Sequence, residues 1–218
     1  MTTLTMAFNL RRFWDENASN FDSLYAARTP FERTFNRLFR RAIFERVERT
    51  AAHILATKKP ARVLDVGCGS GRTSIPLAEA GVGSVLGVDF APRMIELARG
   101  AAAQAGVADR VEYEVADFTT HAFDGPFDFV VALGVFDYVS DAPPFLRRML
   151  ELAKHDVIFS VPKPSLLRAP LRRRRYGKHA VSVHFYDELA IRELTETAGA
   201  TSVRIDRIPA GYLVIASK

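Results

Sequence analysis

Short apolar runs alternate with helical segments along most of the chain. The apolar runs are rich in Val, Ile, Leu and Phe, which is the pattern of buried strands. Such runs predict strands at 63–66, 84–89, 110–116, 127–134 and 155–161. Helical spacing of apolar residues predicts helices at 73–79, 91–98, 141–152 and 187–198. This alternation favours an α/β fold in which a mostly parallel sheet has helices on both faces.

The two ends of the chain depart from this alternation. Residues 8–57 have apolar residues at helical spacing, many of them aromatic, and Pro30 is predicted to separate two helices. Two interpretations of this N-terminal arm, residues 1–60, stay open. It packs over one end of the sheet, or it forms a lid whose aromatic residues, Trp14 among them, line a ligand pocket. At the other end, residues 202–208 and 212–216 predict an antiparallel β-hairpin.

A glycine-rich turn joins the first predicted strand to the first predicted helix. Gly67, Gly69 and Gly71 fall within five positions, where the backbone can turn with positive φ or lie close to a ligand. Their spacing differs from the Gly-x-Gly-x-x-Gly of dinucleotide-binding folds, and no Gly-Lys-Ser/Thr of a phosphate-binding loop follows. Asp65 precedes the turn, and its carboxylate would repel a pyrophosphate but suits an ammonium or sulfonium group.

The segment Val-Leu-Asp-x-Gly-x-Gly-x-Gly, residues 63–71, resembles motif I of class I S-adenosylmethionine (SAM) methyltransferases. The resemblance implies a Rossmann-like, seven-stranded, mostly parallel sheet with a C-terminal antiparallel hairpin. It also implies a SAM-binding domain over residues 61–218, with an N-terminal helical lid over 1–60 and a basic insert at 163–186. The cofactor would be SAM, whose methyl group an acceptor atom attacks by direct displacement.

The same resemblance assigns cofactor contacts beyond the turn. Asp89 ends the second strand and would bind both ribose hydroxyls, with a helix N-cap as its alternative role. Phe90 would pack on the purine ring, Asp117 would accept a hydrogen bond from the adenine amino group, and Phe118 would line the same pocket. The predicted cofactor-binding residues are Asp65, Gly67, Cys68, Gly69, Gly71, Asp89, Phe90, Met94, Asp117, Phe118, Leu133, Gly134 and Tyr25.

Few side chains are candidates for a catalytic base. His184 lies between the basic tract and the helix predicted at 187–198, and an imidazole titrates near neutral pH. Tyr138 follows the fourth strand, where functional residues of open α/β sheets gather. For both residues a structural role is the alternative. No metal is predicted, because the Asp/Asp/Asn set of metal-dependent catechol methyltransferases is not evident and the sequence has no cysteine and histidine cluster with zinc spacing.

Charge is distributed unevenly along the 218 residues, whose formal net charge is +5. Residues 1–62 hold 12 Lys/Arg and 6 Asp/Glu, residues 63–162 hold 7 and 14, and residues 163–186 hold 7 and none. Two basic segments that flank an acidic domain favour an anionic acceptor or partner and make nucleic acid an unlikely one. A solvated loop and contact with RNA or an anionic membrane surface are the alternatives for the basic insert.

The single cysteine excludes an internal disulfide, and the N-terminus lacks the basic start and long apolar run of a signal peptide. A cytoplasmic location is therefore expected. The sequence as a whole predicts SAM-dependent methyl transfer to a small molecule that is anionic or aromatic. An RNA or protein methyltransferase and a SAM-binding protein without turnover are the alternatives, and the oligomeric state is open.

Overall fold

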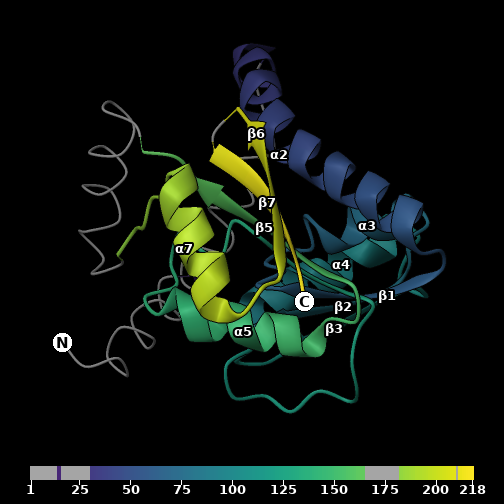
Figure 1. Ribbon diagram of the computed structural model, residues 1–218. Coiled ribbons are helices and arrows are strands. Elements are labelled where there is room, and N and C mark those ends of the chain that lie inside the picture. The colour runs from purple at the N-terminus through teal and green to yellow at the C-terminus, as the bar shows by residue number, and fades with distance from the viewer. Residues whose placement is uncertain (1–13, 16–29, 165–181, 210) are drawn as a thin grey trace.

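The computed structural model describes residues 14–15, 30–164, 182–209 and 211–218, and within 30–43 only the helical backbone. In this part of the chain seven strands form one sheet in the order β3-β2-β1-β4-β5-β7-β6 (Figure 1). The strands are β1 Ala61–Val66, β2 Gly83–Asp89, β3 Val111–Val115, β4 Phe129–Leu133, β5 Asp156–Pro162, β6 Ser202–Ile208 and β7 Gly211–Ser217. Neighbouring strands from β3 to β5 are parallel, and β7 is antiparallel to both β5 and β6. The predicted seven-stranded, mostly parallel sheet is confirmed.

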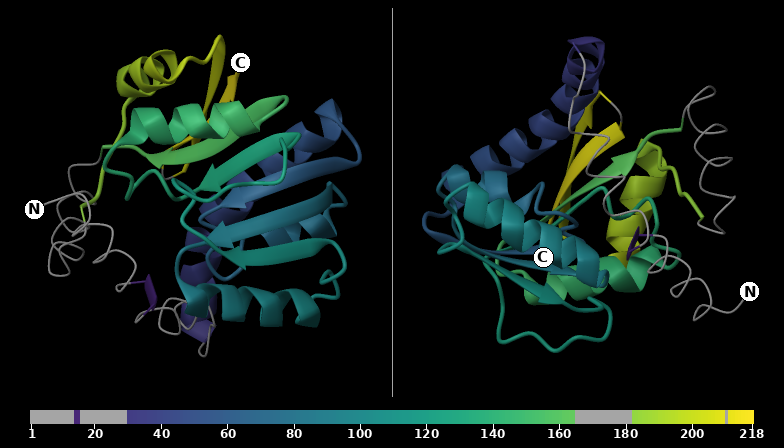
Figure 2. Two further views of the ribbon diagram at one scale, coloured as in Figure 1. Left: turned by 90° about the horizontal axis from the view of Figure 1, so that it is seen from below. Right: turned by 180° about the vertical axis from the view of Figure 1, so that it is seen from behind.

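Helices cover both faces of this sheet, as Figure 2 shows from two directions. The described helices are α2 Pro30–Thr57, α3 Ser74–Glu79, α4 Pro92–Gln104, α5 Ala142–Leu152 and α7 Glu188–Ala198. Buried residues of α2, α3 and α4 share one apolar core with one face of the sheet. Buried residues of α5 and α7 share a second core with the opposite face. The sheet is therefore the middle layer of three.

The central strands are apolar because both of their faces are covered. All five residues of β4 are buried, which agrees with a strand that lacks a solvent-exposed side. The ends of α7 follow local capping rules. The Asp187 carboxylate accepts a hydrogen bond of 2.9 Å from the Ala190 N–H, and Gly199 ends the helix with a φ of +94°.

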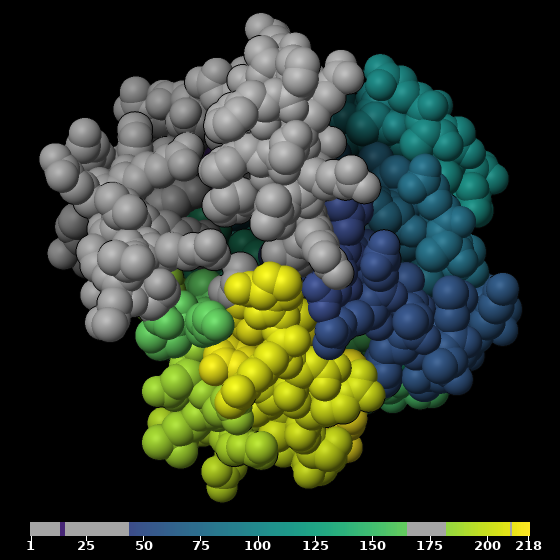
Figure 3. Space-filling view, turned by 90° about the horizontal axis from the view of Figure 1, so that it is seen from above, coloured from purple at the N-terminus to yellow at the C-terminus, as the bar shows by residue number. Residues whose placement is uncertain are grey.

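The C-terminal hairpin completes the sheet in a way that alternation alone does not specify. The predicted hairpin is confirmed, and its second strand, β7, lies between β5 and the edge strand β6. Burial explains the order. Four consecutive residues of β7, Leu213 to Ala216, are buried, whereas most positions of β6 are exposed or partly exposed. In the view from above, the hairpin lies beside α2, and the two elements are in contact (Figure 3).

The second half of α2 packs on the sheet as part of its core. Val47, Ala51 and Ile54 are buried with residues of β1 and β4. The His53 Nε2 atom lies 2.7 Å from an Asp156 carboxylate oxygen and ties the helix to the start of β5. The packing interpretation of the arm therefore applies to this part of α2, while a lid over the site stays a prediction.

Candidate active site

The carboxyl ends of the parallel strands meet at one edge of the sheet, where open α/β folds place their ligands. The glycine turn follows β1 at this edge, and Gly67, Gly69 and Gly71 have φ values of +67°, +53° and +84°. A Cβ atom on Gly71 would lie 2.6 Å from the Tyr113 hydroxyl oxygen, so this glycine is required for packing. No described heavy atom lies within 4 Å of the Cβ position of Gly69, which leaves room there for a ligand.

Asp65 is a buried carboxylate directly beneath the turn. Its side chain is 1% exposed, and it accepts hydrogen bonds from the hydroxyl and the backbone N–H of Ser74. The Ser74 hydroxyl in turn accepts a 3.2 Å hydrogen bond from Tyr113. The Oδ2 atom of Asp65 has no hydrogen-bond partner among the described residues. Burial raises the pKa of Asp65 from 3.8 to about 7.

Arg46 of α2 brings a positive charge to the same place. Its Nη1 atom lies 3.4 Å from the Ser160 hydroxyl, and a Cβ atom on Gly134 would lie 3.2 Å from it. The guanidinium lowers the pKa of Asp65, against the larger effect of burial. The sequence-based predictions did not include Arg46. Its position one residue before Val47, at the border of the buried stripe of α2, was the available signal.

Asp89 connects the end of β2 to the glycine turn. Its Oδ2 accepts a 3.0 Å hydrogen bond from the Gly69 N–H, and its Oδ1 accepts one of 2.9 Å from the Ala91 N–H. Burial raises the pKa of Asp89, and these backbone hydrogen bonds oppose the rise. Each carboxylate oxygen has two lone pairs, so ribose hydroxyls could still donate to Asp89. Ala91 and not Asp89 is the N-cap residue of α4, so the alternative role of Asp89 as a helix N-cap is wrong, and its ribose contact stays a prediction.

The other predicted adenosine contacts lie in two environments. Phe90 is half-buried and Met94 is 2% exposed, and both belong to a small apolar cluster beside Asp89. Asp117 is exposed, and its Oδ1 accepts hydrogen bonds from the backbone N–H and the hydroxyl of Thr119. Phe118 is 5% exposed, and its ring packs in the core beneath α5. Contacts of these residues with adenine stay predictions.

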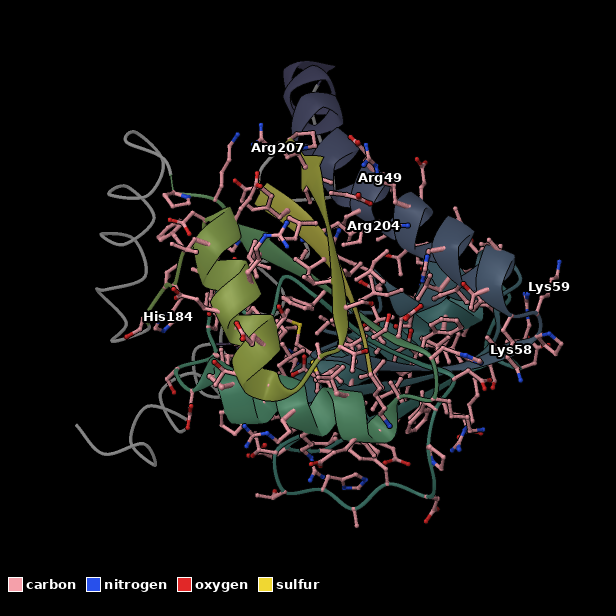
Figure 4. The ribbon with its side chains drawn as sticks, in the orientation of Figure 1. Arg49, Lys58, Lys59, His184, Arg204 and Arg207 are labelled. Carbon is pink, nitrogen blue, oxygen red and sulfur yellow. The ribbon has the colours of Figure 1, made fainter. Side chains whose placement is uncertain are left out.

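The predicted residues after β4 lie close to the segment that precedes α7. Gly134, with a φ of +83°, donates a 2.9 Å hydrogen bond to the Ser160 hydroxyl, and Leu133 beside it is buried. The His184 N–H donates a 2.8 Å hydrogen bond to the Asp137 carbonyl oxygen, so the structure brings His184 near Tyr138. In Figure 4, His184 lies on the opposite side of the view from Lys58 and Lys59, which follow α2.

The remaining predictions concern Cys68, the segments outside the described residues, a membrane-spanning helix and a metal site. Cys68 is buried in the turn, and burial raises the pKa of its thiol well above the ordinary value, so it stays protonated. Tyr25 and residues 165–181 of the basic insert lie outside the described residues. The described helices include none that is long and apolar enough to span a membrane. No group of three or more His, Cys, Asp or Glu that could hold a metal ion occurs in the described part of the chain.

Comparison with known proteins gives a consistent result. Residues 57–197 match the model of a methyltransferase domain family. The chain is 32% identical over 162 residues to the magnesium-protoporphyrin O-methyltransferase of Rhodobacter capsulatus, over 70% of this chain and 68% of that protein. It is 42% identical over 111 residues to the ubiquinone biosynthesis O-methyltransferase of Azorhizobium caulinodans, over 50% of this chain and 43% of that one.

Other relatives are matched over a smaller part of their length. The chain is 33% identical over 97 residues to the ajmaline N-methyltransferase of Rauvolfia serpentina and spans only 33% of it, against 44% of this chain. The fold is similar to that of the magnesium protoporphyrin IX methyltransferase of Synechocystis PCC 6803 with bound S-adenosylhomocysteine. The TM-score is 0.74 at 20% identity, over 96% of this chain and 98% of that one. The motif, the sheet order and the family match agree, and the chain belongs to the class I SAM-dependent methyltransferases.

Proposed function

We propose that this protein transfers the methyl group of SAM to a small molecule that carries an aromatic system and an anionic group. The observation that carries the proposal is Asp65. Its carboxylate is buried under a glycine turn, and one of its oxygens lacks a partner among the described residues, none of which comes within 4 Å of the Cβ position of Gly69. A buried carboxylate is stabilised in its charged form by a nearby cation. A ligand with an ammonium and a sulfonium group fits this environment.

Four groups of this chain would hold the cofactor. The turn from Gly67 to Gly71 supplies backbone at close approach, and Asp65 supplies negative charge beneath it. Asp89 would accept hydrogen bonds from the ribose hydroxyls, and the apolar cluster around Met94 would contact the adenine. When bound, SAM supplies a methyl carbon made electrophilic by its sulfonium. The protein would orient the acceptor against it and exclude water.

The residues after β4 and before α7 would form the acceptor side. Tyr138 and His184 come together there through the hydrogen bond of His184 to the Asp137 carbonyl. An alcohol or phenol acceptor needs a base to remove its proton, and His184 would take it. A carboxylate acceptor is already ionised and needs positioning alone. The basic charge of residues 1–62 and 163–186 would attract either kind of anionic acceptor.

The relatives guide the choice of acceptors to test. One relative is named a magnesium-protoporphyrin O-methyltransferase, and another is named a ubiquinone biosynthesis O-methyltransferase. We therefore propose a carboxylated tetrapyrrole and a phenolic quinone precursor as the first two acceptor classes. Arg46, partly buried beside Gly134, would supply a positive charge near the carboxylate of an acceptor bound after β4.

Calorimetry with SAM and S-adenosylhomocysteine tests the cofactor site directly. We expect both to bind the wild-type protein and the affinity to fall strongly in Asp89→Ala. Asp141→Asn is a matched control, because Asp141 is an exposed acid whose side chain makes no capping hydrogen bond. Wild-type protein that binds neither ligand would refute the proposed function.

A methyl-transfer assay with labelled SAM tests the acceptor class. The panel contains a porphyrin carboxylate, a catechol-type phenol and RNA. We expect transfer to a small molecule and not to RNA. His184→Gln should lower kcat toward a phenol most at neutral pH and leave transfer to a carboxylate within about threefold. Equal loss with both acceptors would mean that His184 positions groups and does not act as a base.

A further inference from the structure

Two residues near the N-terminus contact the start of α4. The Trp14 indole packs against the apolar cluster formed by Ala91 and Met94. The Asp15 Oδ1 accepts a 3.1 Å hydrogen bond from the Arg93 N–H. Ala91, the N-cap residue of α4, has no side chain that could cap the helix. Asp15 therefore supplies a carboxylate where backbone N–H groups lack helical partners and the helix dipole is positive.

The same indole contacts a residue on the other flank of the site. The rings of Trp14 and Tyr138 meet edge to face, with centroids 5.4 Å apart and planes at 82°. Tyr138 follows β4, whereas Met94 lies on the helix after β2. In the sheet β1 lies between β2 and β4, so the glycine turn lies between these two flanks. Trp14 therefore contacts both flanks of the turn.

We propose that Trp14 is a positioning residue that couples cofactor binding to the acceptor side of the site. The inference rests on the proposed function, because it requires SAM to bind between α4 and the turn. A cofactor bound there restrains Met94 and the indole that packs against it, and the indole restrains Tyr138. Since coupling between two sites is reciprocal, the SAM-loaded protein binds the acceptor more tightly than the empty protein does.

The composition of the chain provides a direct reporter. Trp14 is the single tryptophan among the 218 residues, so the intrinsic tryptophan fluorescence of this chain comes from this position alone. Titration with S-adenosylhomocysteine should change the emission and saturate at the Kd measured by calorimetry. Trp14→Ala should weaken that Kd about five- to tenfold, the size of one aromatic pair contact, and Trp14→Phe by less than about twofold.

Two further measurements separate coupling from a structural role. The thermal midpoint of Trp14→Ala without cofactor should fall by only about 2–4 °C, because the half-buried indole contributes about one aromatic pair contact. Leu189→Ala is a control for loss of an exposed apolar side chain, since Leu189 is 66% exposed on α7, and its Kd should equal that of the wild type.

Two results would overturn the coupling alone. One is unchanged emission while calorimetry shows cofactor binding, and the other is a Trp14→Ala variant with the wild-type Kd. Calorimetry without any binding to the wild type would instead refute the proposed function, and the coupling with it. The expected emission change together with the weaker Kd of Trp14→Ala supports the cofactor half of the coupling. The acceptor half is supported when the porphyrin carboxylate binds the wild type more tightly with S-adenosylhomocysteine than without it and Trp14→Ala loses this difference, and equal affinities in the wild type would also overturn the coupling.

Discussion

Replacing Asp65 by Asn should stabilise the protein without cofactor, and the gain should grow with pH. The folded protein holds this carboxyl with a pKa of about 7, whereas the unfolded chain holds it near 3.8. Between these values the folded state keeps a proton that the unfolded state has released. The free energy of unfolding therefore falls as pH rises from about 4 to about 7 and is constant above that range.

The size of the effect follows from the two pKa values. Each pH unit between 3.8 and 7 lowers the free energy of unfolding of the wild type by about 1.4 kcal/mol. The total loss above pH 7 is therefore about 4 kcal/mol. At pH 5 the loss in free energy of unfolding is about 2 kcal/mol, because pH 5 lies only about one pH unit above the pKa of the unfolded chain. The stability difference between Asp65→Asn and wild type should therefore grow by about 3 kcal/mol from pH 5 to pH 8.5.

Urea unfolding followed by circular dichroism at the two pH values measures this difference. Asp141→Asn removes an exposed carboxylate and should stay within about 0.5 kcal/mol of wild type at both. The Asp65→Asn variant should lose SAM affinity even as it gains stability, because the negative charge beneath the turn is gone. An Asp65→Asn stability difference that is equal at pH 5 and pH 8.5 would refute the burial argument.

Three further predictions concern the turn and the cofactor. Gly71→Ala should destabilise the protein by about 2–5 kcal/mol in urea unfolding, because the added Cβ atom would clash with Tyr113. Gly81→Ala is the control: its φ is similar and no described atom lies near its Cβ position, so it should cost about 1–2 kcal/mol. Asp89→Ala should weaken SAM about hundredfold in calorimetry through the loss of two charge-assisted hydrogen bonds of about 1.5 kcal/mol, and a smaller than threefold change would contradict the ribose contact. Wild-type SAM affinity should be up to about tenfold weaker at pH 6 than at pH 8, because Asp65 is then mostly protonated, and a flat pH profile would contradict this.

Much of the fold was predictable because its signals are local. The alternation of apolar runs and helical spacing located most strands and helices to within two residues, whereas α4 extends six residues beyond its predicted end, to Gln104. The place of β7 between β5 and β6 was not predictable in this way, because burial of a strand on both faces depends on what packs there. The role of α2 in the core was open for the same reason.

The sequence by itself determined the ligand class of the site. Glycine spacing and an acid on the preceding strand are short-range features, and they imply a turn that suits a cationic ligand whatever surrounds it. Tertiary structure decided the electrostatics. The pKa of Asp65 depends on its burial, on Ser74 and on Arg46 from another helix. Tertiary structure also brought Trp14 across the turn to Tyr138, 124 positions later in the chain. Burial and long-range contacts arise only when distant segments pack together, so no local pattern encodes them.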